Sequence, residues 1–151
     1  MIQRIQTIYL FFVAILMLAT FFLPVMEMIQ SDGLSSQKLS LFSLSAYSFL
    51  PAFVSPALSL MVGIMALIAI FLYNRRKLQM NFCSWMLALM IILYAAIFYS
   101  YSVLMSKMDE NTTFFPEIAF LFPLLAIILD CMAIAGIRKD QKIVRSLDRL
   151  R

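Results

Sequence analysis

The sequence predicts an all-α membrane protein, a bundle of four antiparallel transmembrane helices. Hydrophobic residues make up 64% of the chain and charged residues 13%, whereas soluble domains are roughly half apolar and about a quarter charged. Four long apolar runs alternate with short polar segments, and each run reaches or exceeds the ~20 residues that cross a bilayer. Because the four runs use most of the 151 residues, we expect a single membrane domain over residues 1–151.

The spans are expected at residues 7–26, 49–73, 79–105 and 115–137. The first run, "TIYLFFVAILMLATFFLPVM", is longer than the apolar region of a signal peptide and no small-x-small cleavage site follows it, so we expect an uncleaved anchor. Only "NRRKLQ" separates the second run from the third. So short a connection predicts that these two helices are antiparallel neighbours.

The distribution of Lys and Arg predicts the orientation. In this arrangement only Lys38 and Lys107 lie on one side of the membrane. Short cytoplasmic loops carry the excess of Lys and Arg. We therefore expect a multi-pass protein with both termini in the cytoplasm. The residues on the basic side are Arg4, Arg75, Arg76, Lys77, Arg138, Lys139, Lys142, Arg145, Arg149 and Arg151.

The first outer loop, residues 27–48, contains a hairpin signal. Asp32-Gly33 is a favoured two-residue turn because both positions tolerate positive φ. The flanking residues alternate only imperfectly between polar and apolar. The loop is thus expected to form a small β-hairpin on the outer side, with an irregular loop at the interface as the alternative.

Small residues mark one face of the second span. Ser55, Ser59 and Gly63 recur every four residues, and such stripes let helix backbones approach closely in membranes. We expect the stripe to contact another helix of the same chain, because tethered neighbours are favoured over a homodimer.

Asp130 is the ionisable residue deepest in a predicted span, about 12 Å along the helix from Arg138. It shares a helix face with Ala126, Ala133 and Ile137, which directs its carboxyl into the bundle. One interpretation is a proton or cation site, or a hydrogen-bond anchor for a partner subunit. The other is a neutral or water-reached carboxyl bonded to Ser55, Ser59 or a tyrosine.

Several kinds of chemistry lack their usual residues. The chain has no histidine and three glycines, so the commonest general base and metal ligand and any phosphate-binding loop are missing. We expect no enzyme activity and no cofactor. Cys83 and Cys131 are expected to be small buried apolar residues, and the basic tail has no aromatic platform that would bind nucleic acid.

The tail, residues 138–151, is expected to be an amphipathic cytoplasmic helix. Its charges could simply retain it in the cytoplasm, bind anionic lipid headgroups or contact a protein. The candidate docking surface joins a narrow apolar stripe to basic flanks. It consists of Arg138, Lys139, Lys142, Ile143, Val144, Arg145, Leu147, Arg149, Leu150 and Arg151.

The two ends of the chain also resemble a known family. "MIQRIQTIYL" at the start, "VRSLDRLR" at the end and the basic turn "NRRKLQ" are similar to an uncharacterised family of Bacteroidota, domain of unknown function 4293. The resemblance implies a bacterial inner-membrane protein with its outer side in the periplasm. It implies no activity and no site residues.

Two functional hypotheses follow. The first is a non-enzymatic subunit that takes part in assembling an envelope complex and uses the C-terminal helix as its cytoplasmic contact. The alternative is a small proton- or cation-coupled transporter or channel that uses Asp130.

Overall fold

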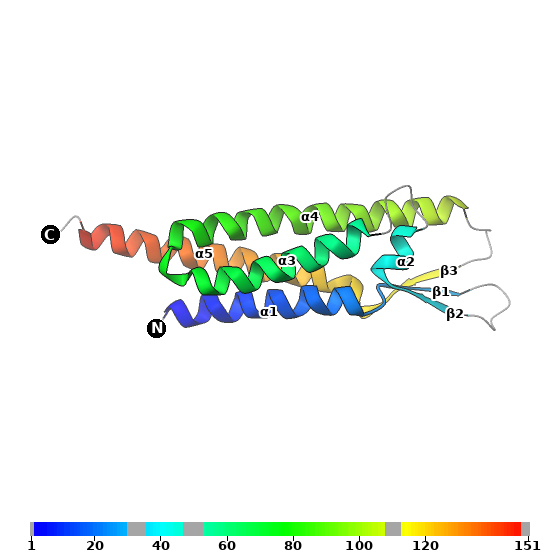
Figure 1. Ribbon diagram of the computed structural model, residues 1–151, viewed down its shortest axis with the longest axis horizontal. Coiled ribbons are helices and arrows are strands. Elements are labelled where there is room, and N and C mark those ends of the chain that lie inside the picture. Colours follow the sequence, from blue (N-terminus) through cyan, green and yellow to red (C-terminus); the bar gives the residue numbers. More distant parts are fainter. Residues whose placement is uncertain (1, 30–35, 47–52, 108–112, 149–151) are drawn as a thin grey trace.

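The computed structural model describes residues 2–29, 36–46, 53–107 and 113–148 (Figure 1). Helices dominate, and three short strands form one sheet. The helices are α1 (Ile2–Phe22), α2 (Leu41–Ala46), α3 (Val54–Phe71), α4 (Arg76–Lys107) and α5 (Phe122–Asp148), with 3-10 turns η1 (Leu72–Asn74) and η2 (Ile118–Leu121). The strands are β1 (Met26–Ile29), β2 (Ser36–Leu39) and β3 (Thr113–Pro116).

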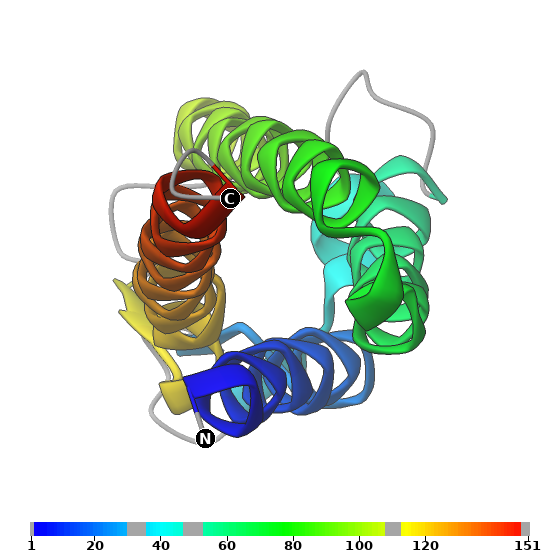
Figure 2. The same ribbon diagram turned by 90° about the vertical axis from the view of Figure 1, so that its left-hand side faces the viewer.

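The four long helices form a ring, in the order α1, α3, α4, α5 (Figure 2). Each packs against its two neighbours, and α3 lies across the ring from α5. We call the end that carries the strands the sheet end, and the opposite end, where the N-terminus and the end of α5 lie, the tail end (Figure 1). Helices α3 and α4 lie side by side through η1, as the short connection between them predicts.

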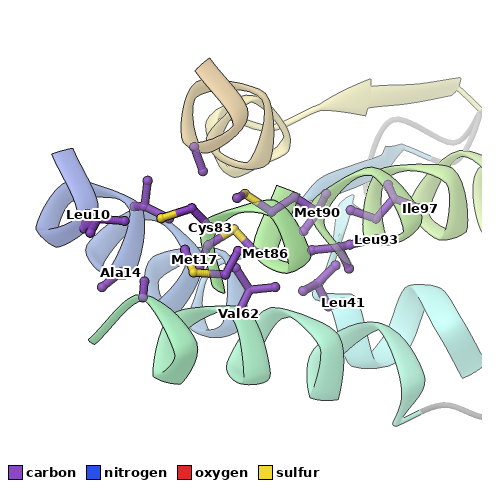
Figure 3. Packing of buried hydrophobic residues seen from close by; sticks show 14 of the residues in the cluster. Leu10, Ala14, Met17, Leu41, Val62, Cys83, Met86, Met90, Leu93 and Ile97 are labelled. Carbon is purple, nitrogen blue, oxygen red and sulfur yellow. The ribbon is translucent and has the colours of Figure 1, made fainter. Parts of the chain in front are cut away.

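Large apolar side chains fill the interior of the ring (Figure 3). Leu10 and Met17 from α1 and Met86, Met90 and Leu93 from α4 belong to this cluster, and all five are 0% exposed. Methionine is unbranched and flexible, so it fills irregular gaps between helices. The interior is therefore a packed apolar core.

The predicted stripe of small residues faces α1. The Ser59 hydroxyl donates a hydrogen bond of 2.7 Å to the backbone carbonyl of Met17. A Cβ atom on Gly63 would lie 3.3 Å from the side chain of Leu18, a distance that requires Leu18 to shift. The stripe thus brings the α3 and α1 backbones close together, as small residues do in membrane helices.

The sheet has the strand order β2-β1-β3, with both neighbouring pairs antiparallel. Strands β1 and β2 pair as the expected hairpin requires, with Met26 opposite Leu39. The predicted Asp32-Gly33 turn lies outside the described residues. Strand β3, from the second outer loop, was not predicted, nor was α2 in the first.

Some helices begin or end at other residues than the predicted spans do. The fourth span was expected to begin at residue 115, but α5 begins at Phe122 after a strand and a 3-10 turn. Residues 113–121 are strongly apolar, yet aromatic residues suit strands and β1 supplies the pairing partner. The first span was expected to reach residue 26, but α1 ends at Phe22, where Pro24 prevents its continuation.

Three helices are long and apolar enough to cross a membrane, namely those within Val54–Phe71, Lys77–Lys107 and Ile118–Asp140. The apolar part of α1, Gln6–Phe22, is shorter. Helix α5 continues without interruption from the predicted fourth span into the predicted tail and ends at Asp148. The tail is therefore not a separate helix as far as the description extends.

Candidate functional site

Asp130 lies on α5 and is 0% exposed. Its three predicted face neighbours Ala126, Ala133 and Ile137 are buried with it. Neither carboxyl oxygen has a hydrogen-bond partner within the described part of the chain. The thiol of Cys83, on α4, lies near the carboxyl and is a weak donor toward it, although it does not meet the geometry of a regular hydrogen bond. Because buried polar groups are normally hydrogen-bonded, Asp130 is an exception that calls for a physical explanation.

The structure does not join Asp130 to the serines of the predicted polar site. Ser55 and Ser59 are buried on α3, across the ring from α5 (Figure 2). The Ser59 hydroxyl donates to the Met17 carbonyl, and neither serine donates to the carboxyl. The interpretation of Asp130 as a carboxyl bonded to these two serines is therefore wrong.

The cysteines differ in their surroundings. Both thiols are free. Cys83 is buried, as expected, but Cys131 is exposed. The expectation for Cys131 was wrong because it directly follows Asp130 on α5, so its side chain leaves the helix on a different face.

At the tail end, α1 and α5 are joined by a buried polar contact that no sequence pattern predicts. The Gln6 amide donates a hydrogen bond of 2.7 Å to the Asp140 carboxylate. These two side chains are 7% and 8% exposed. A Cβ atom on Gly136 would lie 3.1 Å from Cγ of Gln6. Glycine at this position, one helical turn before Asp140, thus leaves the space in which the Gln6 side chain lies.

The candidate docking surface begins directly beside this contact. Arg138 and Lys139 are exposed, whereas the next residue, Asp140, turns into the ring. The structure describes the helical backbone of the following predicted residues to Asp148 but not their side chains, those of Lys142, Ile143, Val144, Arg145 and Leu147. The last three predicted residues, Arg149, Leu150 and Arg151, lie outside the described residues.

An ion pair stabilises the sheet end. The Lys38 ammonium on β2 lies 2.9 Å from the Glu117 carboxylate, which precedes η2. The Glu117 backbone N–H also donates to the Val25 carbonyl. The hydrogen bond and the charge of Glu117 raise the pKa of Lys38, and the charge of Glu27 adds to this effect.

The raised pKa of Lys38 predicts how this ion pair responds to pH. Its contribution is complete below the usual lysine pKa of 10.5 and is lost as the pH rises through the higher pKa of the folded state. Thermal unfolding should show a small stability advantage of the unmodified protein over Lys38→Met below pH 10.5. That advantage should shrink above it, and an unchanged difference would mean that Lys38 acts through packing alone.

One sequence family matches nearly the whole chain. It is described as domain of unknown function (DUF4293), and the match covers residues 2–150. The chain belongs to the DUF4293 family. The match includes every described helix and strand, so the DUF4293 resemblance seen at the two ends of the chain is confirmed and extends between them. No curated protein and no solved structure matches the chain.

Proposed function

We propose that the chain is a multi-pass inner-membrane protein that acts as a non-enzymatic assembly subunit of an envelope complex, with the end of α5 as its cytoplasmic contact. One observation carries this proposal. Helix α5 runs without a break from Phe122 to Asp148 and extends beyond the other helices at the tail end (Figure 1). It offers a continuous helical segment outside the ring.

The proposed membrane placement uses four spans. Three helices meet the length and hydropathy of a span, and we add α1, whose apolar part Gln6–Phe22 reaches about 26 Å, at the short end of the range. Exposed basic residues at the tail end, including Arg75, Lys77 and Arg138, favour a cytoplasmic position for this end. The sheet would then lie in the periplasm.

The continuity of α5 favours a protein partner over a lipid surface. An amphipathic helix that binds headgroups lies in the plane of the interface. To do so, α5 would have to bend sharply where it leaves the membrane, and such kinks occur at Pro, Gly/Ser pairs or helix bulges. Residues 138–148, "RKDQKIVRSLD", contain neither Pro nor Gly. From Asp140 to Asp148 the helix would therefore project about 12 Å into the cytoplasm.

The Gln6–Asp140 contact supports the same role. It joins α1 to α5 at the base of the projecting segment, with Gly136 beneath it. A surface that is held at its base loses less conformational freedom on binding, which favours affinity. The segment beyond it repeats apolar residues at Ile143, Val144 and Leu147, a spacing used by helices that dock into apolar grooves.

Two tail variants test this function. In the first, Ile143, Val144 and Leu147 are changed to Ser, which removes the apolar stripe and keeps every charge. In the matched control, Lys142, Arg145 and Arg149 are changed to Gln, which keeps the stripe. Crosslinking in cells followed by purification in mild detergent should recover a stoichiometric partner from the unmodified chain, and the stripe variant should lose it.

A monomer in cells, or a partner that survives loss of the stripe, would overturn the proposal. The proposal would also be contradicted if only the charge variant lost the partner. That result would mean that the basic side chains, and not the apolar stripe, bind the partner. A C-terminal topology reporter should show the same cytoplasmic tail in both variants.

Asp130 supports a second candidate, a proton- or cation-coupled transporter or channel. A fully buried carboxyl without hydrogen bonds is expensive in a membrane, and intramembrane carboxyls mark ion and proton pathways. Asp130→Asn should abolish a proton- or cation-dependent flux in proteoliposomes, whereas Ser100→Ala, a change at another buried residue, should leave it intact. Equal flux in the unmodified and Asp130→Asn proteins, or flux in neither, would exclude this candidate.

A further inference from the structure

A pocket of about 140 Å³ lies at the sheet end, between the outer part of α4 and the sheet. Its walls come from three segments that are far apart in the sequence, and five of the seven lining residues are aromatic. They are Met26 from β1, Phe98 and Tyr101 from α4, Phe114, Phe115 and Pro116 from β3, and Phe120 from η2.

Contacts among the lining residues fix the shape of the pocket. The rings of Tyr101 and Phe114 meet edge to face with their centres 6.1 Å apart. The sheet pairs Met26 with Pro116. On the far wall, the Tyr94 hydroxyl donates to the Phe120 carbonyl at 3.4 Å, and their rings are 5.4 Å apart. The pocket is thus preformed, which lowers the conformational-entropy cost of binding a ligand in it.

The lining determines the chemistry of the ligand. A buried water needs two to four polar partners, and among the lining side chains only Tyr101 carries a polar group. An enclosed apolar cavity of about 150 Å³ stays dry and admits a molecule the size of benzene; this pocket is similar in volume and mainly apolar, but it is partly open. The present pocket therefore suits a short hydrocarbon segment.

The position of the pocket identifies the source of that hydrocarbon, given the membrane placement proposed above. About 20 helical residues cross the hydrocarbon core, so α4, which starts at Arg76, reaches the outer boundary near Phe98. Phe98 and Phe115 line the pocket and are 65% and 53% exposed, so we infer that its mouth lies at these two residues. Its mouth then meets the outer leaflet at the depth of the upper part of the acyl chains.

We propose that this pocket binds the glycerol-proximal segment of one acyl chain and so retains one phospholipid of the outer leaflet against the sheet. The aromatic walls hold the chain by apolar contact. A lipid bound in this way differs from the surrounding bilayer lipids, which exchange freely along the helices.

Lipid retention in native mass spectrometry tests the proposal. The full chain is loaded with dioleoyl phosphatidylglycerol and then washed in lipid-free detergent. The unmodified protein should keep one lipid per chain. The variant Phe98→Ala/Phe115→Ala should retain that lipid about tenfold less well, a change of about 1.4 kcal/mol, because it removes two of the apolar rings that line the pocket. Both residues are exposed, so the fold should persist, as thermal unfolding can verify.

The matched control is Phe42→Ala/Phe71→Ala, which removes two aromatic rings of similar or greater exposure, 58% and 79%, outside the pocket lining. It should retain the lipid as the unmodified protein does. Equal losses in the two double variants, or no retained lipid in the unmodified chain, would overturn the proposal.

A photoreactive diazirine near the carboxyl end of the acyl chain provides the positional test. It should label the peptides that contain Phe98 and Phe114 in preference to the lipid-facing residues of α3, such as Ile64. Uniform labelling would contradict the site. Lipid retention should also survive deletion of residues 143–151, so its outcome is independent of the proposed tail contact.

Discussion

Replacing Asp130 by Val is expected to stabilise the protein by about 1–3 kcal/mol. The carboxyl is fully buried and has no hydrogen-bond partner of regular geometry within the described part of the chain, with only the weakly donating Cys83 thiol near it. An unsatisfied buried polar group costs about that much. Val introduces no polar atom and is only modestly larger than Asp. The free energy of unfolding in detergent micelles, measured by thermal or denaturant titration, checks this expectation.

The controls separate polarity from packing. Asp130→Asn keeps a polar group at the same position and should give little gain. Ser100→Ala removes another buried, unpartnered oxygen, Oγ of Ser100, and should be neutral or slightly stabilising. A clear loss of stability in Asp130→Val would show that the carboxyl is engaged in the folded state. If Asp130→Val is more stable but loses the ion flux or the partner binding proposed above, the carboxyl serves that function at a cost in stability.

The opposite effect is expected at the tail end, where Gln6→Leu should destabilise the protein by about 1.5–3 kcal/mol. This variant leaves the buried Asp140 carboxylate without the 2.7 Å hydrogen bond from Gln6. Hydrogen bonds to charged groups contribute about this amount, and an unpaired buried charge adds to the loss. Because the contact joins α1 to α5, hydrogen exchange in the first turns of α1 should also increase.

A double-mutant cycle tests whether this loss arises from the pair. Removing both polar groups in Gln6→Leu/Asp140→Leu should recover most of the stability, because two apolar side chains leave nothing unsatisfied. Gly136→Ala provides a third measurement. Its new Cβ would lie 3.1 Å from Gln6, so it should weaken the same contact to a smaller degree. Strictly additive effects of the two leucine substitutions would show that Gln6 and Asp140 act separately.

The sequence predicted the helical, apolar character of the chain because composition and run length report burial in hydrocarbon directly. It also predicted the close approach made by Ser59 and Gly63 and the strands on either side of residues 30–35. It placed residues 115 and 116, the end of β3, in a span because hydropathy cannot distinguish an aromatic strand from a lipid-facing helix. Only the presence of β1 beside Thr113–Pro116 decides between them.

The partners of polar residues were harder to predict. The helix face of Asp130 follows from spacing alone, but its distance from Ser55 and Ser59 depends on the order of helices around the ring, which puts α3 opposite α5. Gln6 and Asp140 are 134 positions apart, and neither carries a local signal for the other. Their contact follows from the packing of α1 against α5 and from the space at Gly136.

The strand order also has a consequence for biogenesis. Strand β1 lies at the centre of the sheet, but one of its partners, β3, is synthesised only after α3 and α4. During translation the β1 edge facing β3 must stay unpaired until residues 113–116 have been synthesised. The sheet therefore joins the exit of the first long helix to the entry of the last, and closing it is a late step in maturation. An inserted chain that stops before β3 would expose an open strand edge, the kind of feature that quality-control proteases and chaperones encounter on unfinished proteins.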